Sequence, residues 1–199
     1  MSVGKIVTGF SKPYVAKYSA SGTTISYSSG QLLSQGVSIS GSADQADDNN
    51  FYADNVISET ESGVFTSGEL TVTVKGLEQA AERLIMGLPA ADGTTGLVAY
   101  DDQQQIPDVG FGAVVRYMQD GVTSYVPVIY PRIAFKFPAV EAATQEETID
   151  WQTQELTATI KRAEDSHRTW KYIGDGKTTE AAAEDVIKTF LGVSSGTST

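Results

Sequence analysis

Short runs in which apolar and polar residues alternate recur along this chain, and they constrain its fold more than any other feature. Apolar residues occupy every second position in 70–74 and again in 133–137. A period of two places these side chains on one face of a β-strand. The alternation therefore predicts half-buried strands and a chain made mostly of β-structure.

A tight hairpin is expected between two β-rich runs at 111–118 and 123–128. Asp-Gly at 120–121 lies between them, and this dipeptide is the strongest short-range signal for a hairpin turn. Three prolines follow between 127 and 138. Because proline cannot donate a hydrogen bond to a neighbouring strand, we expect sheet edges or bends in this region.

A long strand with a change of register is expected at 148–161. Ile149 and Trp151 share one parity, whereas the apolar residues within 156–160 have the opposite parity. A continuous pleat cannot bury both sets on one face. The pattern predicts either a bulge near 153–154 or a strand that passes between two packing environments.

Helical spacing replaces the alternation in two places. Apolar residues at 77–88 recur three or four positions apart, and Pro89 stops this predicted helix. A second apolar stripe covers 183–191, with a threonine at 178 or 179 as the N-cap and Gly192 just beyond the helix end. Both segments are expected to cover a β-structured body.

The order of strands, helix, strands and helix predicts an α+β chain, mainly β, with an antiparallel body. A last short strand is expected at 167–172, and a long connection rich in Gly, Gln and Asp at 89–110. The length of 199 residues suits one domain over 1–192 followed by a flexible tail at 193–199.

Acidic residues outnumber basic ones by 25 to 14, which gives a net charge of -11. Residues 18–74 and 84–115 contain no Lys or Arg, although acids occur in both stretches. A protein that binds polyanions normally carries a basic excess, so we do not expect tight sequence-specific binding of DNA or RNA. The pattern predicts one strongly acidic region in the folded protein, with solubility as the simpler alternative explanation.

The sequence contains no constellation of catalytic or metal-binding residues. There is no Cys, and His167 is the only His, so thiolate sites and His clusters are excluded. Asp165, Ser166 and His167 are adjacent, and neighbours on a strand point to opposite faces, so they do not make a triad. The acidic turn at 44–50 lacks the EF-hand spacing. We expect no enzyme activity, no cofactor and no metal.

The sequence also bears on membrane insertion and on sugar binding. No apolar run approaches 18 residues and the first residues lack an apolar core, so we expect no membrane span and no secretory signal. Trp151 and Trp170 are chemically able to stack on a sugar or a base, but tryptophans in β-rich segments more often belong to the core.

Several short sequence strings carry no recognisable chemistry, but the order in which they follow one another along the chain is informative. They are FYADN at 51–55, GELT at 68–71, GFGAVV at 110–115, PRIAF at 131–135 and TIDWQT at 148–153. In this order the chain resembles the major tail proteins (tail tube proteins) of long-tailed bacteriophages, especially the branch from phages of Gram-positive hosts. The resemblance covers roughly residues 40–172. Its most distinctive positions are Tyr52, Ala53, Asp54, Asp150, Trp151 and Thr153.

This resemblance implies a two-sheet sandwich or barrel with a flanking helix and a C-terminal helix. It also implies stacked hexameric rings that form a hollow tube through which DNA leaves the head. The implied partners are other copies of the chain, a tape measure protein inside the tube, and tail terminator and distal tail proteins. DNA would pass without specific binding, and no membrane is involved. The implied location is the virion tail, after assembly in the host cytoplasm.

The alternatives within and outside this family stay open. Contractile phage tails, phage-like bacteriocins and type VI secretion systems have tubes of related fold. Longer relatives carry a C-terminal immunoglobulin-like domain, for which we expect no room after the second helix. A non-viral β-sandwich binding module and a carboxylate-based hydrolase are the alternatives from other classes.

An acidic wall repels phosphates, so acidic residues are the candidates for the lumen of such a tube or for its assembly contacts. The candidate lining comes from the strands around 44–61 and from the hairpin at 111–128. Within 51–59 the alternation predicts that Asp54 faces water and that Phe51 and Ile57 face inward. Residues 42–50 are expected to form a loop. The candidate acids are Asp44, Asp47, Asp48, Asp54, Glu59 and Glu61.

Overall fold

The computed structural model describes residues 4–53, 55–61, 63–139 and 152–193. It is mainly β, with 50% of residues in strands and 11% in helices, which confirms the expected composition. The helices are α1 (Gln79–Met86) and α2 (Glu180–Phe190). The strands are β1 (Ile6–Ser21), β2 (Thr24–Leu32), β3 (Gly36–Gln45), β4 (Asn49–Ala53), β5 (Val56–Glu61), β6 (Phe65–Val74), β7 (Val109–Gln119), β8 (Val122–Phe135), β9 (Gln154–Ile160) and β10 (Tyr172–Ile173).

One antiparallel sheet holds most of these strands. Its order is β2-β1-β7-β8-β9-β6-β3, and β10 pairs with β8 beside this path. The strands β4 and β5 form a separate two-stranded hairpin. The antiparallel body is therefore confirmed, but the hydrogen-bonded strands form one open sheet, and the expected division into two packed sheets is not confirmed.

The sheet curls, so that β1 and β3 approach each other without pairing. Phe10 of β1 packs on Gly36 of β3, where a Cβ atom would collide with the phenyl ring. The pairing of β1 with β7 shifts register between Val7 and Gly9 and again before Tyr14. Such bulges increase the local twist of a strand, and this explains how β1 follows the curl.

The main core fills the concave side of the curled sheet. The predicted alternation holds in β6 and β9, whose inward residues are fully or almost fully buried. Helix α1 closes this side with Ala81, Ile85 and Met86. The core members from the sheet include Val15, Leu70, Val72, Val74, Phe111, Val128, Ile133, Phe135, Leu156 and Ile160.

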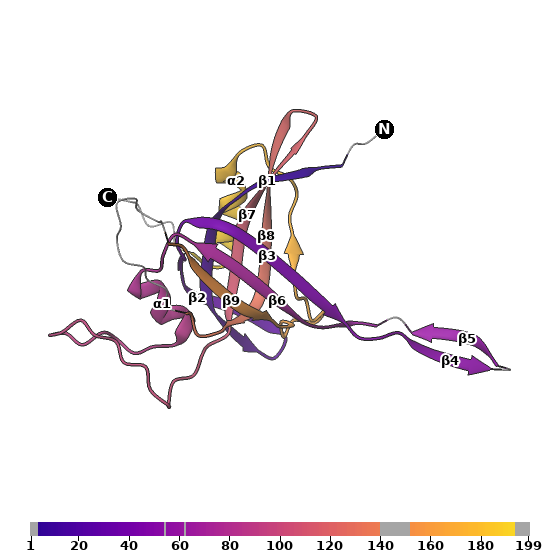
Figure 1. Cartoon of the computed structure of the whole chain (residues 1–199), viewed down its shortest axis with the longest axis horizontal. Helices are drawn as coiled ribbons and strands as arrows, with labels where there is room; N and C mark the ends of the chain where they lie inside the picture. The colour runs from indigo at the N-terminus through magenta and orange to yellow at the C-terminus, as the bar shows by residue number, and fades with distance from the viewer. Residues whose placement is uncertain (1–3, 54, 62, 140–151, 194–199) are drawn as a thin grey trace.

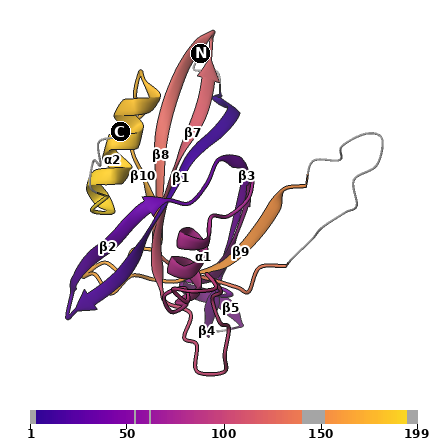
Figure 2. The same cartoon turned by 90° about the vertical axis from the view of Figure 1, so that its left-hand side faces the viewer.

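Helix α2 covers the opposite face of β1, β7 and β8, and Figure 2 shows the two helices on opposite sides of these strands. Ala183, Ile187 and Leu191 are its buried contacts. The helix approaches closely because β7 carries glycines: a Cβ at Gly112 would lie 2.5 Å from Cγ2 of Ile187. The central parts of β1, β7 and β8 are therefore buried on both faces.

The ends of both helices follow from their sequences. Helix α1 stops at Gly87 with a φ of 68°, two residues before the expected stop at Pro89. Glycine adopts this left-handed conformation without steric cost. Helix α2 has Thr179 as its N-cap, and the threonine side chain accepts a hydrogen bond from the Ala182 amide. Gly192 follows α2 with a φ of 60°, as expected.

The predicted hairpin between β7 and β8 is confirmed. Asp120 and Gly121 have φ values of 49° and 78°, and two positive values in a two-residue loop match a type I′ turn. The register of β7 and β8 shifts around Pro131, which is the expected bend. The alternation does not extend to Phe137, because β8 ends at Phe135 and the Phe137 side chain is exposed.

Three sequence predictions differ from the structure. The strand expected at 167–172 is reduced to β10, because Asp165 and Arg168 begin a hydrogen-bonded turn instead. Residues 42–50 are not a loop, since β3 continues to Gln45 and β4 begins at Asn49. The register change with Ile149 and Trp151 lies outside the described residues.

The long connection before β7 forms as expected and packs against α1. Gln104 donates from Nε2 to the Met86 carbonyl at 2.7 Å, and the Tyr100 hydroxyl donates to Glu82 at 2.7 Å. Burial and this carboxylate raise the pKa of Tyr100 to about 12. Val98 and Ile106 contact the main core. The connection thus extends the cover that α1 provides.

The replacement Ile85→Ala tests the role of α1. Ile85 is fully buried, whereas its neighbour Leu84 is half-buried, although the sequence pattern places both on the apolar stripe. Removing a buried isoleucine side chain leaves a cavity, so we expect a loss of about 2–5 kcal/mol in the free energy of unfolding. Urea denaturation measures this loss. Leu84→Ala is the control, and an equal or larger loss there would contradict the packing described.

Candidate functional site

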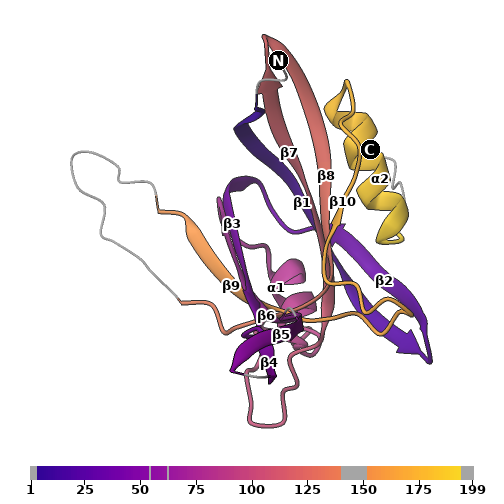
Figure 3. The ribbon, with the colours of Figure 1, turned by 90° about the vertical axis from the view of Figure 1, so that its right-hand side faces the viewer.

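The candidate acids lie along a β-ribbon that projects from the body. Strands β3 and β6 run outward together and continue into the β4–β5 hairpin, which extends beyond the rest of the molecule (Figure 1) and faces the viewer in Figure 3. Asp44 lies near the end of β3, Asp47 and Asp48 lie between β3 and β4, and Glu59 lies in β5. Glu61 ends β5, and Asp54 lies outside the described residues.

The exposed acids of the ribbon make local hydrogen bonds. Asp44 accepts one from the Ser67 hydroxyl at 3.1 Å, and Asp48 accepts one from the Gly63 amide at 2.9 Å. Among the described residues, no Lys or Arg forms an ion pair with Asp44, Asp47 or Asp48. Uncompensated carboxylates that lie close together give this ribbon a negative potential.

The predicted inward orientation of Ile57 is wrong. Val56 and Ile57 have opposite parities, yet they are 63% and 54% exposed. The hairpin projects from the body, so neither face is covered, and strand alternation buries a face only where a second layer exists. The side chains of Phe51 and Asp54, which the same prediction included, lie outside the described residues.

The distinctive positions of the family resemblance are only partly described. Tyr52 and Ala53 lie in β4 of the projecting hairpin. Thr153 is exposed and directly precedes β9. Asp150 and Trp151 lie outside the described residues. The structure thus separates Thr153, at the body, from Tyr52 and Ala53, at the ribbon.

An aromatic stack lies where the ribbon leaves the body. The rings of Phe65, at the start of β6, and Trp170 are parallel within 2° and 4.6 Å apart. The guanidinium of Arg162 lies 5.8 Å from the Phe65 ring. Trp170 is half-buried in this contact, so it packs on the protein itself. The stack ties the base of the ribbon to the segment that follows β9.

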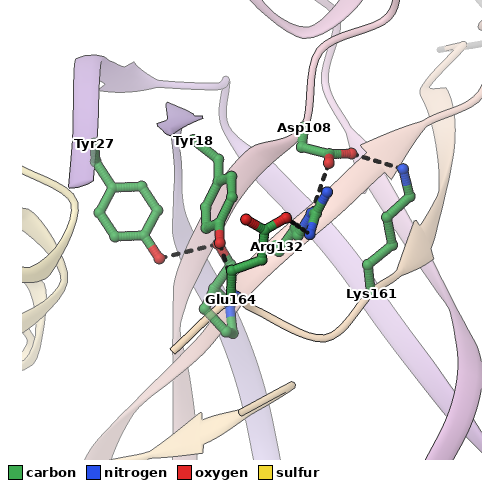
Figure 4. Close-up of polar contacts among 7 residues, drawn as sticks. Tyr18, Tyr27, Asp108, Arg132, Lys161 and Glu164 are labelled. Atoms are coloured by element: carbon green, nitrogen blue, oxygen red, sulfur yellow. Dashed lines mark hydrogen bonds and ion pairs between the residues drawn. The ribbon is translucent and has the colours of Figure 1, made fainter. Parts of the chain in front are cut away.

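A polar network on the body joins elements that are distant in sequence (Figure 4). Arg132 of β8 pairs with Asp108 at 2.6 Å and Glu164 at 2.7 Å, and Lys161 pairs with Asp108 at 2.7 Å. The Arg132 guanidinium also lies 5.2 Å from the ring centre of Tyr18 in β1. Burial opposes its charge, but the hydrogen bonds that Arg132 donates to these two carboxylates, together with their negative charges, hold the pKa of Arg132 above its ordinary value.

Two tyrosines of β1 and β2 complete this network. The Tyr18 hydroxyl accepts a hydrogen bond from the Glu164 amide at 2.9 Å, and the Tyr27 hydroxyl donates to the Pro131 carbonyl at 3.0 Å. Burial raises the pKa of Tyr27 above its ordinary value, so this phenol stays protonated. Each of the four charged groups in the network has a partner of opposite charge. The network therefore has a structural role, because it links β1 and β8 to the segments around Asp108 and Glu164.

The neighbouring Asp165, Ser166 and His167 do not converge on a reacting centre. The Asp165 carboxylate accepts hydrogen bonds from the Thr169 amide at 2.7 Å and the Tyr172 hydroxyl at 3.1 Å. Burial opposes the shift, but these bonds lower the pKa of Asp165. His167 is exposed, and its Nδ1 atom lies 3.1 Å from the Ser166 hydroxyl oxygen. The carboxylate is therefore engaged in the local turn.

Metal sites and membrane-spanning helices are absent from the described part of the chain. No group of three or more His, Asp or Glu side chains there is arranged to hold a metal ion. Neither of the two described helices is long and apolar enough to cross a membrane.

Two bases that the sequence interpretation missed are Lys17 and Arg83, which line a groove beside α1. A sequence signal for them exists, because each directly precedes one of the two stretches without Lys or Arg. The borders of these stretches identify the two residues, but they do not show that both lie on one surface.

Comparison of the sequence with protein-family models and with curated proteins gave no match. A function for this chain is therefore inferred from the sequence strings and from the geometry of the ribbon, the sheet and the groove.

The replacement Asp108→Asn tests the polar network. It removes the shared partner of Arg132 and Lys161, whose pairing with Asp108 is partly buried, and leaves two cations facing a neutral amide. We expect the free energy of unfolding to fall by about 1–3 kcal/mol. Glu69→Gln is the matched control, because the exposed Glu69–Lys136 pair contributes about 1 kcal/mol or less. An equal loss of unfolding free energy in the two variants would show that the network stabilises the fold no more than an exposed ion pair does.

Proposed function

We propose that this chain is a structural subunit of a viral tail tube, which assembles with copies of itself into rings that stack around a DNA channel. The observation that carries the proposal is the ordered set of strings over 40–172, which resembles tail tube proteins. The mainly antiparallel β body with two flanking helices is compatible with this family. In the proposal, the curled sheet of one chain corresponds to the sandwich or barrel of the tail-tube type.

The surfaces of the chain support self-assembly. β2 and β3 are the end strands of the sheet path, and a free strand edge presents backbone groups that pair with another chain. Ile6, Val7 and Val122 are exposed where β1, β7 and β8 extend together beyond the core. Exposed apolar side chains that cluster mark contact sites for other proteins.

The charge of the ribbon supports a channel for DNA. A wall that carries carboxylates without compensating cations repels phosphates, so DNA moves past it without binding. In the proposal Asp44, Asp47 and Asp48, at the base of the projecting hairpin, face the channel.

The proposal includes the partners and location that the resemblance implies. The ring is hexameric, a tape measure protein occupies the tube before DNA release, and tail terminator and distal tail proteins bind its ends. The assembled protein belongs to the virion tail and has no enzymatic role or cofactor.

Self-assembly is the first test. We expect the purified chain to form rings or tubes at high concentration, because its open sheet edges and projecting hairpin have no partner surface within the described part of one copy. Negative-stain electron microscopy and sedimentation velocity over a concentration series measure this. A chain that stays monomeric at all concentrations, and also in the presence of tail extracts that support assembly, contradicts the proposal.

The double replacement Asp47→Lys and Asp48→Lys tests the channel. We expect tubes to assemble normally but DNA release from virions to slow at low salt, because the wall now attracts phosphates. The difference should shrink as the Debye length falls to about 10 Å at 0.1 M salt. Asp175→Lys with Asp185→Lys is the control, since both side chains are exposed and lie away from the ribbon. Normal assembly with unchanged release would exclude a channel position for Asp47 and Asp48.

A further inference from the structure

A groove of about 690 Å³ lies between helix α1, strands β1 and β2, and the end of the connection before β7. Its apolar lining comes from Leu84, Leu88, Ile106 and Pro107. Among the described residues, the charged side chains that line it are Lys17 and Arg83, and no acid does so. In a chain with a net charge of -11, a surface of this composition is suited to an acidic partner with apolar side chains.

Both bases of the groove remain available to such a partner. Lys17 is exposed and forms no ion pair within the described residues. Arg83 donates from Nε to the Pro89 carbonyl at 2.7 Å, which uses one of the five donors of a guanidinium and fixes its position. The groove therefore presents an exposed lysine and an oriented arginine beside apolar surface.

The projecting hairpin has the complementary composition. Beyond Asp47 and Asp48 at its base, residues 49–61 contain three acids and no base. The exposed Val56 and Ile57 add apolar side chains to the hairpin, where no described residue of their own chain covers them. The hairpin thus combines the two properties that the groove would recognise.

The groove and the hairpin lie at opposite ends of the molecule. Figure 1 shows α1 and β2 at the left along the longest axis and β4 and β5 at the far right. In Figure 2 the side with α1 and β2 faces the viewer, and in Figure 3 the hairpin side does. A hairpin therefore cannot occupy the groove of its own chain, so the matching occupant is a second copy.

We propose that the β4–β5 hairpin of one copy docks in the groove between α1 and β2 of the next copy. Because the two surfaces differ, the contact is heterologous, and repetition of such a contact closes a ring or propagates a filament. The inference rests on the proposed function, and it assigns one contact between subunits. In this arrangement the outer part of the hairpin forms the contact between subunits, whereas the acids at the hairpin base face the channel.

A second depression on the body is a poorer match. It is lined by Glu69 and Glu155 as well as Lys75 and Lys136, and Lys136 already pairs with Glu69. Its mixed and partly paired charges give no preference for an acidic hairpin.

Disulfide trapping tests the contact directly, because the chain has no natural cysteine. Val56→Cys places a thiol on the hairpin, and Gln105→Cys places one at an exposed position of the groove. The two variants are mixed under assembly conditions and oxidised with copper phenanthroline. We expect the mixed dimer, in which a Val56→Cys chain is linked to a Gln105→Cys chain, to exceed either self-linked dimer at least tenfold. Met118→Cys replaces Gln105→Cys as the control, because Met118 lies at the end of β7, outside the groove.

Charge exchange gives an independent measurement. Glu59→Lys on the hairpin and Arg83→Glu in the groove should each raise the concentration needed for assembly at least tenfold. The double variant restores the pair with reversed signs and should recover most of this loss. Arg116→Glu is the control, since Arg116 is exposed and lies outside the groove. Circular dichroism confirms that each variant folds.

The outcomes separate this inference from the proposed function. Rings or tubes that form while the Val56→Cys chain links to the Met118→Cys chain in preference to the Gln105→Cys chain would overturn the docking and leave the tube proposal standing. Absence of recovery in the double charge variant would overturn the docking as well. A chain that never assembles would overturn both proposals.

Discussion

The burial of β7 and β8 on both faces is the constraint on which the rest of the structure depends. Their inward residues fill the concave core, and their outward face receives α2 at a distance that only glycine at 110 and 112 permits. Since both faces are covered along the middle of these strands, the proposed contacts involve other surfaces: the sheet edges, the ribbon and the groove beside α1.

The ribbon has a different physical basis from the body. Its backbone hydrogen bonds pair β3 with β6 and β4 with β5, but the described residues of its outer part bury no apolar layer. The stack of Phe65 on Trp170 fixes its base, and an acidic end without Lys or Arg extends into solvent. In this segment the backbone is hydrogen-bonded while the described apolar side chains are uncovered, and the proposed contact with another copy would cover them.

The sequence interpretation succeeded where the signal is local. The Asp120–Gly121 turn, the α2 N-cap and the alternation in β6 and β9 depend on residues within a few positions of one another. It failed for Ile57 and for the expected loop at 42–50, because projection of a hairpin is decided by which layers exist around it. The groove was missed because Lys17 and Arg83 are brought together by β1 and α1, which are distant in sequence.

The sequence by itself determined that the chain is mainly antiparallel β with two amphipathic helices, that it lacks thiol and His-cluster chemistry, and that Lys and Arg are absent from 18–74 and 84–115. These properties depend on composition and on short-range periodicity. Only the tertiary structure decided that the strands form one curled sheet, that the helices cover opposite faces, and that the acidic hairpin and the basic groove lie at opposite ends. Strand order and the direction of a projection depend on contacts between distant segments, and a pattern of period two carries no information about them.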